Sequence, residues 1–340
     1  MLTRDDLSGV ARAAFVSRRL VGVSRLRGGS KKGAYRLFLD DESTAVAYVW
    51  AESENYWPGH AAYTPADAYG DPFSDASGLA LFSAAQRELD AAGVRTPRVY
   101  LTDDGGRYYP ADVAVVEDVP GESLESLLEK EPEKAAGVMG RLAEALDAMY
   151  QRLSPRYGKV AFVRDGGISA GNSCEQVVLD RAIADLAEAA SRDARIWRHR
   201  ARLSALLDEL AAQVPPRAEY RLIHGELGPD HVLVDRCAEP VLIDIEGLMF
   251  FDIECEHVFL RLRFGPLYHQ VLARADLDER RMALYTLAMR LSLVAGPLRL
   301  LDGDFPDRAF MLEIVEHNLR ETLALLEGCS RPNRSGCGRR

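Results

Sequence analysis

Acidic and imidazole side chains gather in one stretch of the chain, residues 221–247, which read RLIHGELGPDHVLVDRCAEPVLIDIEG. Within it His231 follows Glu226 by five positions, and Asp244 follows Glu226 by eighteen. Carboxylates and an imidazole that are held close together suit an oxygen-ligated cation or the transfer of a proton. This stretch is therefore where we expect chemistry.

Two short strands must position these groups. Val232–Val234 and Val241–Ile243 are apolar runs with β-branched residues, and the polar residues 235–239 between them suit a turn. Two such runs joined by a polar turn predict a β-hairpin. Burial of both runs would bring the acidic side chains and His231 into one small volume.

The spacing resembles the catalytic loop and metal-binding hairpin of the aminoglycoside phosphotransferase family, which has the protein-kinase-like fold. The family's loop runs His-Gly-Asp-Leu, carries an Asn five positions after the Asp, and ends its hairpin with Ile-Asp. Here residues 224–227 read HGEL, residue 231 is His, and residues 243–244 read ID. These matches in register favour the family over the alternative, an ordinary hairpin with surface acids.

The resemblance implies a small-molecule kinase that transfers the γ-phosphate of ATP or GTP to a hydroxyl of its substrate, an antibiotic or a metabolite. It implies Glu226 as the catalytic carboxylate, with His224 beside it to brace the loop by hydrogen bonds rather than to act as a base. His231, Asp244 and Glu246 would be ligands of the cation, Mg²⁺ or Mn²⁺. Glu226 and His231 depart from the family's Asp and Asn, and Asp244 keeps the family's residue.

A glycine-rich hairpin tip is expected near the N-terminus. Strands are predicted over residues 20–23, 35–39 and 45–50, and the tip between the first two contains Gly28, Gly29, Ser30, Lys31 and Lys32. Glycines let backbone N–H groups approach a phosphate closely, and the two lysines add positive charge. A plain turn is the alternative, and the hairpin later in the chain supports a nucleotide-binding role.

The third strand lacks the phosphate-binding lysine that the resemblance implies. No lysine occurs in residues 33–129, and Tyr48 is the expected occupant of the position. If a nucleotide binds, Lys31, Lys32 or an arginine must supply the charge. The helix predicted next in the chain, over residues 79–92, offers Glu88 as the glutamate that would meet the missing lysine, or else as a solvated charge.

Two more strands, predicted over residues 98–102 and 112–116, complete the N-terminal sheet. Breaker residues follow near Pro120 and end it. By the resemblance, this connection joins two lobes, and the backbone of Glu117 and Val119 holds the adenine edge.

The expected fold class is α+β. It is a bilobal protein-kinase-like fold with a small antiparallel-sheet N-lobe that carries one helix, and a larger, mainly helical C-lobe. We place the N-lobe at residues 1–119 and the C-lobe at residues 120–330. Residues 331–340 are basic and rich in Gly and Ser, which predicts a disordered tail.

Three further features have open interpretations. Residues 52–78 form a long aromatic connection that suits either a lid or a segment packed onto the body. Arginines recur within residues 192–202, and acids among them favour a solvated helix face over an anion site. By the resemblance, Asp252 is expected to brace the catalytic loop.

Composition limits the classes of function. The chain has 340 residues, 47% of them hydrophobic, and a net charge of −10, which suits two globular lobes and argues against a nucleic-acid-coating surface. Its five cysteines form no CxxC pair, which fits a reducing compartment. The sequence shows no secretory signal and no run near the ~18 apolar residues of a membrane span. We expect a cytoplasmic protein with a small-molecule substrate and no nucleic-acid or membrane partner.

Alternative functions stay open on the sequence alone. Glu226 moves the carboxylate by roughly 1 Å relative to Asp, which can cost about a hundredfold in rate, and His231 is a poorer Mg²⁺ ligand than an oxygen. With the missing strand lysine, these departures leave a catalytically impaired, pseudokinase-like binding protein as the alternative to a kinase. A third interpretation is a transition-metal site with other chemistry.

Overall fold

The computed structural model describes residues 1–26, 28–57, 71–73, 76–169, 171 and 173–329. The chain divides into two units, one formed by Met1–Ala170 with Ala218–Ala275 and the other by Gly171–Arg217 with Asp276–Arg340. All of the residues expected to bind nucleotide or cation, or to act in catalysis, belong to the first unit. The expected tail at 331–340 and most of the long connection, residues 58–70 and 74–75, lie outside the described residues.

A five-stranded antiparallel sheet opens the first unit, in the order β1-β2-β3-β5-β4. Its strands are β1 Leu20–Arg25, β2 Gly33–Leu39, β3 Thr44–Trp50, β4 Val99–Asp103 and β5 Asp112–Glu117. Alternation along β2 buries Tyr35, Leu37 and Leu39 on one face. The five strands predicted for this region are therefore confirmed, and so is the α+β class.

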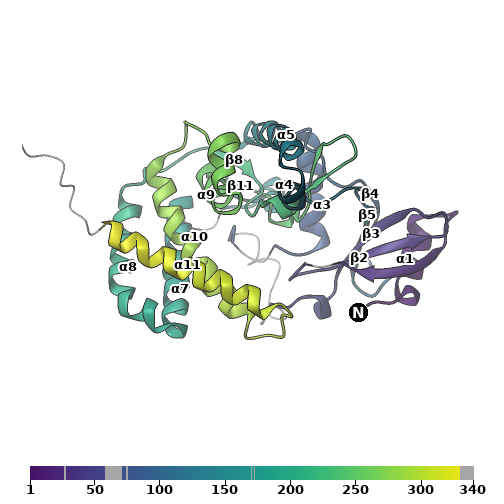
Figure 1. Ribbon diagram of the computed structural model, residues 1–340, viewed down its shortest axis with the longest axis horizontal. Coiled ribbons are helices and arrows are strands. Elements are labelled where there is room, and N and C mark those ends of the chain that lie inside the picture. The colour runs from purple at the N-terminus through teal and green to yellow at the C-terminus, as the bar shows by residue number, and fades with distance from the viewer. Residues whose placement is uncertain (27, 58–70, 74–75, 170, 172, 330–340) are drawn as a thin grey trace, which may run out of the picture. The chain divides into compact units, whose positions relative to one another are not determined.

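Helix α1, Arg4–Ala14, covers one face of this sheet (Figure 1). Thr3 caps it, and Asp6 returns the bond to the Thr3 backbone, a capping box that fixes where the helix begins. Its buried residues Leu7, Val10 and Ala11 join the apolar side chains of β2, β3 and β5 in one core.

Helix α3, Leu79–Ala91, packs on the sheet near Tyr48. The Phe82 ring lies edge-on to Tyr48 at 5.7 Å and against Trp50 at 5.6 Å between ring centroids. Before α3, the described part of the long connection holds a short 3-10 helix, Glu52–Glu54. The helix predicted over residues 79–92 is confirmed.

The rest of the first unit combines helices with two small sheets. Its helices are α4 Leu124–Lys130, α5 Pro132–Tyr150, α6 Val160–Arg164 and α9 Ile253–Phe264, followed by a π-helical turn, Tyr268–Leu272. One sheet has the order β6-β8-β11-β7, with β6 Leu153–Ser154, β7 Gly158–Lys159, β8 Tyr220–Ile223 and β11 Met249–Phe251. Within residues 157–169, β7 pairs with β11 and α6 buries Val160.

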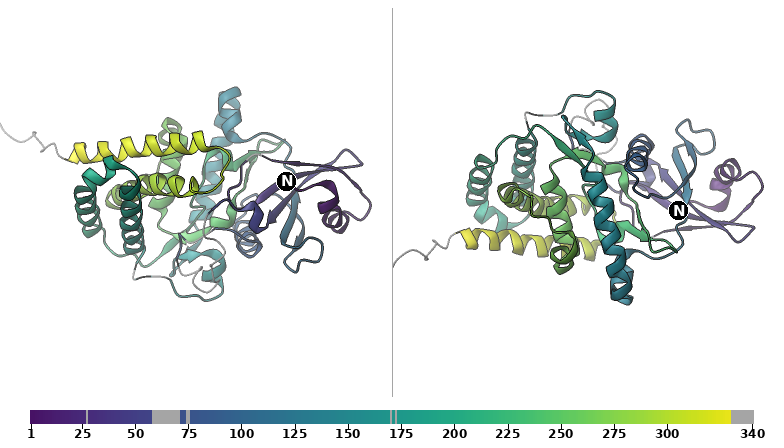
Figure 2. Two further views of the ribbon diagram at one scale, coloured as in Figure 1. Left: turned by 90° about the horizontal axis from the view of Figure 1, so that it is seen from below. Right: turned by 90° about the horizontal axis from the view of Figure 1, so that it is seen from above.

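The second unit contains, within the described residues, the helices α7 Cys174–Arg192, α8 Ala194–Ala212, α10 Glu279–Leu300 and α11 Arg308–Cys329. Helix α10 packs against α7 and α11, and α7 packs against α8. Both views of Figure 2 show α10 beside α11. The mainly helical character predicted for the C-terminal part is confirmed.

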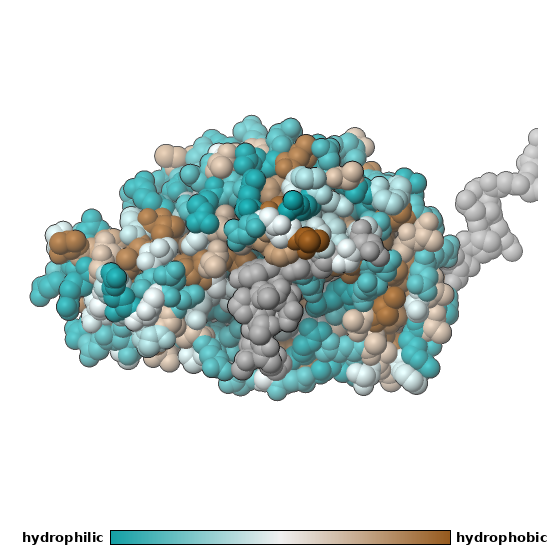
Figure 3. Space-filling view, turned by 180° about the vertical axis from the view of Figure 1, so that it is seen from behind, coloured by the Kyte–Doolittle hydropathy of each residue, from teal (hydrophilic) through white to brown (hydrophobic). Residues whose placement is uncertain are grey.

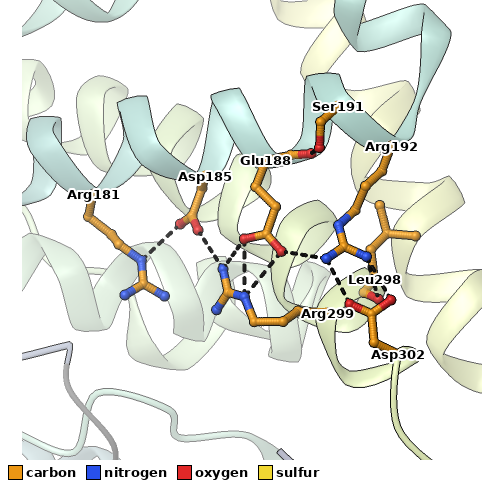
Figure 4. Close-up of polar contacts among 8 residues, drawn as sticks. All are labelled: Arg181, Asp185, Glu188, Ser191, Arg192, Leu298, Arg299 and Asp302. Atoms are coloured by element: carbon orange, nitrogen blue, oxygen red, sulfur yellow. Dashed lines mark hydrogen bonds and ion pairs between the residues drawn. The ribbon is translucent and has the colours of Figure 1, made fainter. Parts of the chain in front are cut away.

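Acids meet the arginines of this unit in a network between α7 and α10 (Figure 4). Arg299 contacts Glu188 and, at 3.6 Å, Asp185, while Arg192 bonds Asp302 at 2.8 Å. Arg195 pairs with Glu316 at 2.9 Å. These pairings favour helix-surface salt bridges over an anion site.

Hydrophilic residues cover most of the face shown in Figure 3, with hydrophobic ones scattered among them. The exposed large hydrophobic side chains of the described residues include Val16 and Ile168 in the first unit and Trp197 and Phe310 in the second. No helix among the described residues is both long and apolar enough to cross a membrane.

Candidate active site

A hairpin of β9, Val232–Val234, and β10, Pro240–Leu242, carries the candidate site. The strands pair antiparallel with Val241 opposite Leu233, as the sequence predicts. The predicted catalytic loop leaves β8 through Gly225, whose φ of +91° disfavours any residue with a side chain and where an added Cβ would lie 2.9 Å from the Met249 Cε. The loop's path is therefore fixed at this glycine.

His224 ties the start of the loop to the end of the hairpin. Its Nε2 donates to the carbonyl oxygen of Ile243 at 3.0 Å, so Nδ1 carries no proton in the neutral ring. Burial, and then the neighbouring His231, lower the pKa of His224 to about 4. His224 is thus neutral at physiological pH and placed to brace the loop.

His231 has its ring orientation set by the loop itself. Its Nδ1 donates to the backbone oxygen of Glu226 at 2.8 Å, which leaves the lone pair of a neutral ring on Nε2. That Nε2 lies 3.7 Å from one carboxylate oxygen of Asp230 and 3.7 Å from one of Asp244. A hydrogen bond of this kind is how proteins orient imidazoles that bind metals.

The side chain of Glu226 is exposed at the surface of the first unit. Its backbone oxygen accepts a hydrogen bond from His231, and its carboxylate has no hydrogen bond or ion pair with the part of the chain that the structure describes. The carboxylate of Glu226 is therefore accessible to a substrate.

A second carboxylate lies beneath the loop. Glu256, on α9, accepts a hydrogen bond from the Gly225 N–H at 2.6 Å and is completely buried. We expected Asp252 to brace the loop; Asp252 is also completely buried, and this contact comes from Glu256, one turn further along. Sequence reasoning missed Glu256, which follows another acid, Glu254, by two positions, and nothing in the sequence tells which of them reaches the loop.

Asp244 and Glu246 meet the ammonium of Lys32. The Lys32 Nζ lies 2.9 Å from Asp244 Oδ1 and 2.5 Å from Glu246 Oε1. It also lies 4.9 Å from the centre of the Tyr48 ring. Burial opposes the charge on Lys32, but the two carboxylates outweigh it and hold the pKa of Lys32 above its usual value.

Asp244 has an unusual backbone conformation for a residue with a side chain. Its φ of 59° and ψ of 45° lie in the left-handed region, which costs free energy and occurs at functional sites. Lys32 lowers the pKa of Asp244, against the opposing effect of burial, so the carboxylate is ionised. The turn therefore presents an ionised carboxylate beside Lys32 and His231.

The glycine-rich tip turns through Gly28 and Gly29, with φ of +88° and +75°. A Cβ at Gly29 would lie 2.6 Å from the Lys32 backbone oxygen. The Ser30 Oγ accepts from Trp57 Nε1 at 3.0 Å, and Ser77 Oγ donates to the Lys31 oxygen at 3.1 Å. The tip is thus held by residues of the long connection.

The connection expected to hold adenine has part of its backbone in use. Glu117 donates its N–H to the Arg98 oxygen at 2.8 Å, and its carboxylate pairs with Arg95 at 3.0 Å. Val119 is buried. The N–H of Glu117 is therefore already used and is not available to a ligand.

Glu88 contacts arginines instead of a sheet lysine. Its Oε1 lies 2.8 Å from Arg152 and 2.5 Å from Arg164. The interpretation of Glu88 as a solvated charge is wrong, because it is buried and paired.

The fit of the site to a divalent cation depends on its donors. No group of three or more His, Cys, Asp or Glu side chains that could hold a metal ion exists among the described residues. Asp244 is 43% exposed, whereas Glu246 is 3% exposed and bonded to Lys32. Mg²⁺ commonly takes one or two carboxylates and completes its shell with phosphate oxygens and water. The residues fit such a shared cation, with Asp244 as its carboxylate and His231 beside it.

A glycine-turned tip, a buried lysine and an acid-bearing hairpin define a phosphoryl-transfer type of site. The family model described as the phosphotransferase enzyme family matches residues 71–285, and the chain belongs to that family. Comparison with curated proteins finds no match.

Solved structures of the same fold include the aminoglycoside phosphotransferase APH(4)-Ia, with 19% identity, 93% of this chain and 98% of that chain covered, and a TM-score of 0.59. The GDP complex of aminoglycoside 2'-phosphotransferase-IIIa has 20% identity, 92% and 96% coverage, and a TM-score of 0.58. A putative fructosamine-3-kinase from Thermobifida fusca YX-ER1 has 17% identity, 94% and 99% coverage, and a TM-score of 0.54. At these identities the likeness establishes the protein-kinase-like fold.

Proposed function

We propose that the protein is a kinase that transfers the γ-phosphoryl group of ATP or GTP to a hydroxyl of a small molecule. The observation that carries this proposal is the contact of the Lys32 ammonium with Asp244, at 2.9 Å. Phosphoryl transfer depends on positioned positive charge. Lys32 supplies that charge although β3 offers Tyr48 at the expected position.

The roles of the side chains follow from their exposure and charge. Glu226, exposed near the start of the loop, accepts the proton of the substrate hydroxyl. Asp244, with His231 beside it, holds the divalent cation that neutralises the phosphates when nucleotide binds. Lys32 bonds a phosphate oxygen, and backbone N–H groups of residues 28–31 approach the phosphates from the tip.

The substrate class we propose is an amino sugar or a glycoside with a free hydroxyl. Two of the similar structures are complexes of aminoglycoside phosphotransferases with hygromycin B and kanamycin, and a third is a putative fructosamine-3-kinase. A panel of aminoglycosides and glycated amines, tested for nucleotide turnover with Mg²⁺ or Mn²⁺, covers these chemistries.

The mechanism is tested with Glu226→Gln, which removes the carboxylate, and with Glu226→Asp, which keeps a carboxylate. We expect Glu226→Gln to lower kcat by roughly a hundredfold or more, because general bases contribute about that much, with nucleotide affinity unchanged. Glu239→Gln, in the exposed turn of the same hairpin, is the control and should keep wild-type kcat. Full activity of Glu226→Gln would remove Glu226 from the mechanism. Nucleotide binding without turnover on any substrate would favour the binding-protein alternative.

A further inference from the structure

Lys32 comes from the β1–β2 tip, yet its ammonium lies over the residue of β3 where the resemblance implies a lysine. The nitrogen is 4.9 Å from the Tyr48 ring centre, a distance at which the ring attracts the charge. Lys32 itself is only 7% exposed. Lys32 of the tip therefore places a positive charge beside Tyr48, where β3 itself has no lysine.

The two carboxylates that meet Lys32 differ in their surroundings. Glu246 is 3% exposed, and its other oxygen, Oε2, has no hydrogen-bond partner among the described residues. Asp244 is 43% exposed. The ammonium is thus anchored on its buried side by Glu246 and reaches the open side at Asp244.

The glutamate of helix α3 does not take part in this contact. Glu88 lies at Arg152, which follows α5, and at Arg164, the last residue of α6. Among the described contacts of Lys32, the carboxylates are those of Asp244 and Glu246. Two of the three ammonium N–H groups are used there, which leaves one for a ligand oxygen.

We infer that Glu246 is the positioning residue that holds Lys32 as the phosphate-binding cation, in place of a lysine on β3 paired with a glutamate on α3. Glu246 acts through Lys32 and is not a ligand of the divalent cation. This inference rests on the proposed function and assigns a separate task to each acid of the turn. Asp244 faces the cation and Glu246 faces the lysine.

Removal of the Glu246 charge has a definite consequence. Lys32 would keep Asp244 as its carboxylate partner and would then compete with the divalent cation for the Asp244 carboxylate. Charge-assisted hydrogen bonds of this kind correspond to roughly ten- to a hundredfold in binding. We expect Glu246→Gln to weaken the affinity for Mg²⁺–AMP-PNP by about tenfold or more.

A double-mutant cycle with Lys32→Met and Glu246→Gln tests the inference by calorimetric titration of Mg²⁺–AMP-PNP. If Glu246 acts through Lys32, the Glu246→Gln change costs affinity in the wild-type background and nothing further when Lys32 is already Met. Losses that multiply in the double variant would overturn the inference. The comparison of Asp244→Asn with Glu246→Gln by Mn²⁺ binding needs no Lys32 variant, so the inference stays testable if Lys32→Met does not fold.

Two controls separate the possible roles. Glu88→Gln should leave nucleotide affinity within about twofold, because Glu88 contacts arginines instead of Lys32. Binding of Mn²⁺ with saturating AMP-PNP, followed by electron paramagnetic resonance, should weaken far more in Asp244→Asn than in Glu246→Gln. An equal loss in both variants would make Glu246 a cation ligand and overturn the inference.

Failure of the inference and failure of the proposed function give different results. If the wild-type protein binds no Mg²⁺–AMP-PNP at millimolar concentration, the proposed function falls and the inference with it. Suppose instead that the wild-type protein binds Mg²⁺–AMP-PNP, and that Glu88→Gln lowers this affinity but has no further effect when Lys32 is already Met. The inference alone is then overturned.

Discussion

Glu256 should make the stability of the protein depend on pH in an unusual direction. This carboxyl is completely buried beneath the catalytic loop, where it accepts the Gly225 N–H at 2.6 Å. Burial raises the pKa of Glu256 to about 7, and the N–H groups of Gly225 and His224 oppose that rise. In the unfolded chain the group ionises near its usual value of 4.5.

Between these two values the folded protein keeps a proton that the unfolded chain has lost. The free energy of unfolding contributed by this group therefore falls as pH rises through the window from 4.5 to about 7. One pKa unit corresponds to about 1.4 kcal/mol, so the full loss is about 3 kcal/mol at pH values above the window.

Glu256→Gln fixes the neutral state and removes this titration. We expect the variant to gain about 2–3 kcal/mol relative to wild type between about pH 5 and about pH 8, measured by urea unfolding at several pH values. Glu88→Gln is a control of opposite sign, because Arg164 and Arg152 lower the pKa of Glu88 against burial. Its carboxylate stabilises the fold above the unfolded pKa and loses that effect as pH falls.

A constant difference between Glu256→Gln and wild type over this range would refute the reasoning. So would a variant that becomes less stable than wild type as pH rises. Either result would mean that Glu256 is ionised in the folded protein and is held by the two loop N–H groups.

Two further predictions concern stability, each with a matched control and each measured by urea unfolding. Gly121→Ala should cost about 3 kcal/mol or more, because a Cβ there would lie 1.9 Å from the Val234 oxygen and the φ of Gly121 is +155°. Gly137→Ala, at a position on α5 where an added Cβ meets no atom within 4 Å, should stabilise the protein by about 0.5–1 kcal/mol. Equal effects of the two substitutions would contradict this argument. Arg299→Met should cost about 2 kcal/mol, because it removes the pair with Glu188 and the contact with the 2% exposed Asp185, which keeps Arg181 at 3.2 Å. Arg195→Met, on a solvent-exposed pair, should cost under about 1 kcal/mol. A smaller loss for Arg299→Met than for Arg195→Met would show that the network in Figure 4 adds no stability.

The sequence predicts the backbone of the site well, because that backbone follows local patterns. Alternation and turn residues indicate the strands of the N-terminal sheet and the β9–β10 hairpin, and Gly28 and Gly29 take the left-handed conformations that a tight tip requires. The division of the chain into an N-lobe at residues 1–119 and a C-lobe at residues 120–330 remains a prediction.

The side-chain pairings were beyond the sequence. Lys32 and Asp244 are 212 positions apart, and their contact accompanies a left-handed backbone at Asp244 and a Lys32 ammonium that lies 4.9 Å from the centre of the Tyr48 ring. Sequence patterns predict which residue occupies a position on β3, but they do not predict which side chain from another segment reaches that position. The same limit hid the pairing of Glu88 with two arginines, which comes from packing of α3 against α6.

A lysine on a strand is positioned by the sheet, whereas a lysine next to a glycine-rich tip needs another source of rigidity. Here the long connection provides it. The Trp57 indole bonds the Ser30 hydroxyl, the Tyr56 N–H bonds the Ser30 oxygen at 2.9 Å, and Ser77 bonds the Lys31 oxygen. Because these contacts fix the two residues before Lys32, they also fix the direction in which its side chain leaves the tip. The aromatic connection, the tip and Glu246 therefore act together to place the Lys32 ammonium beside Tyr48.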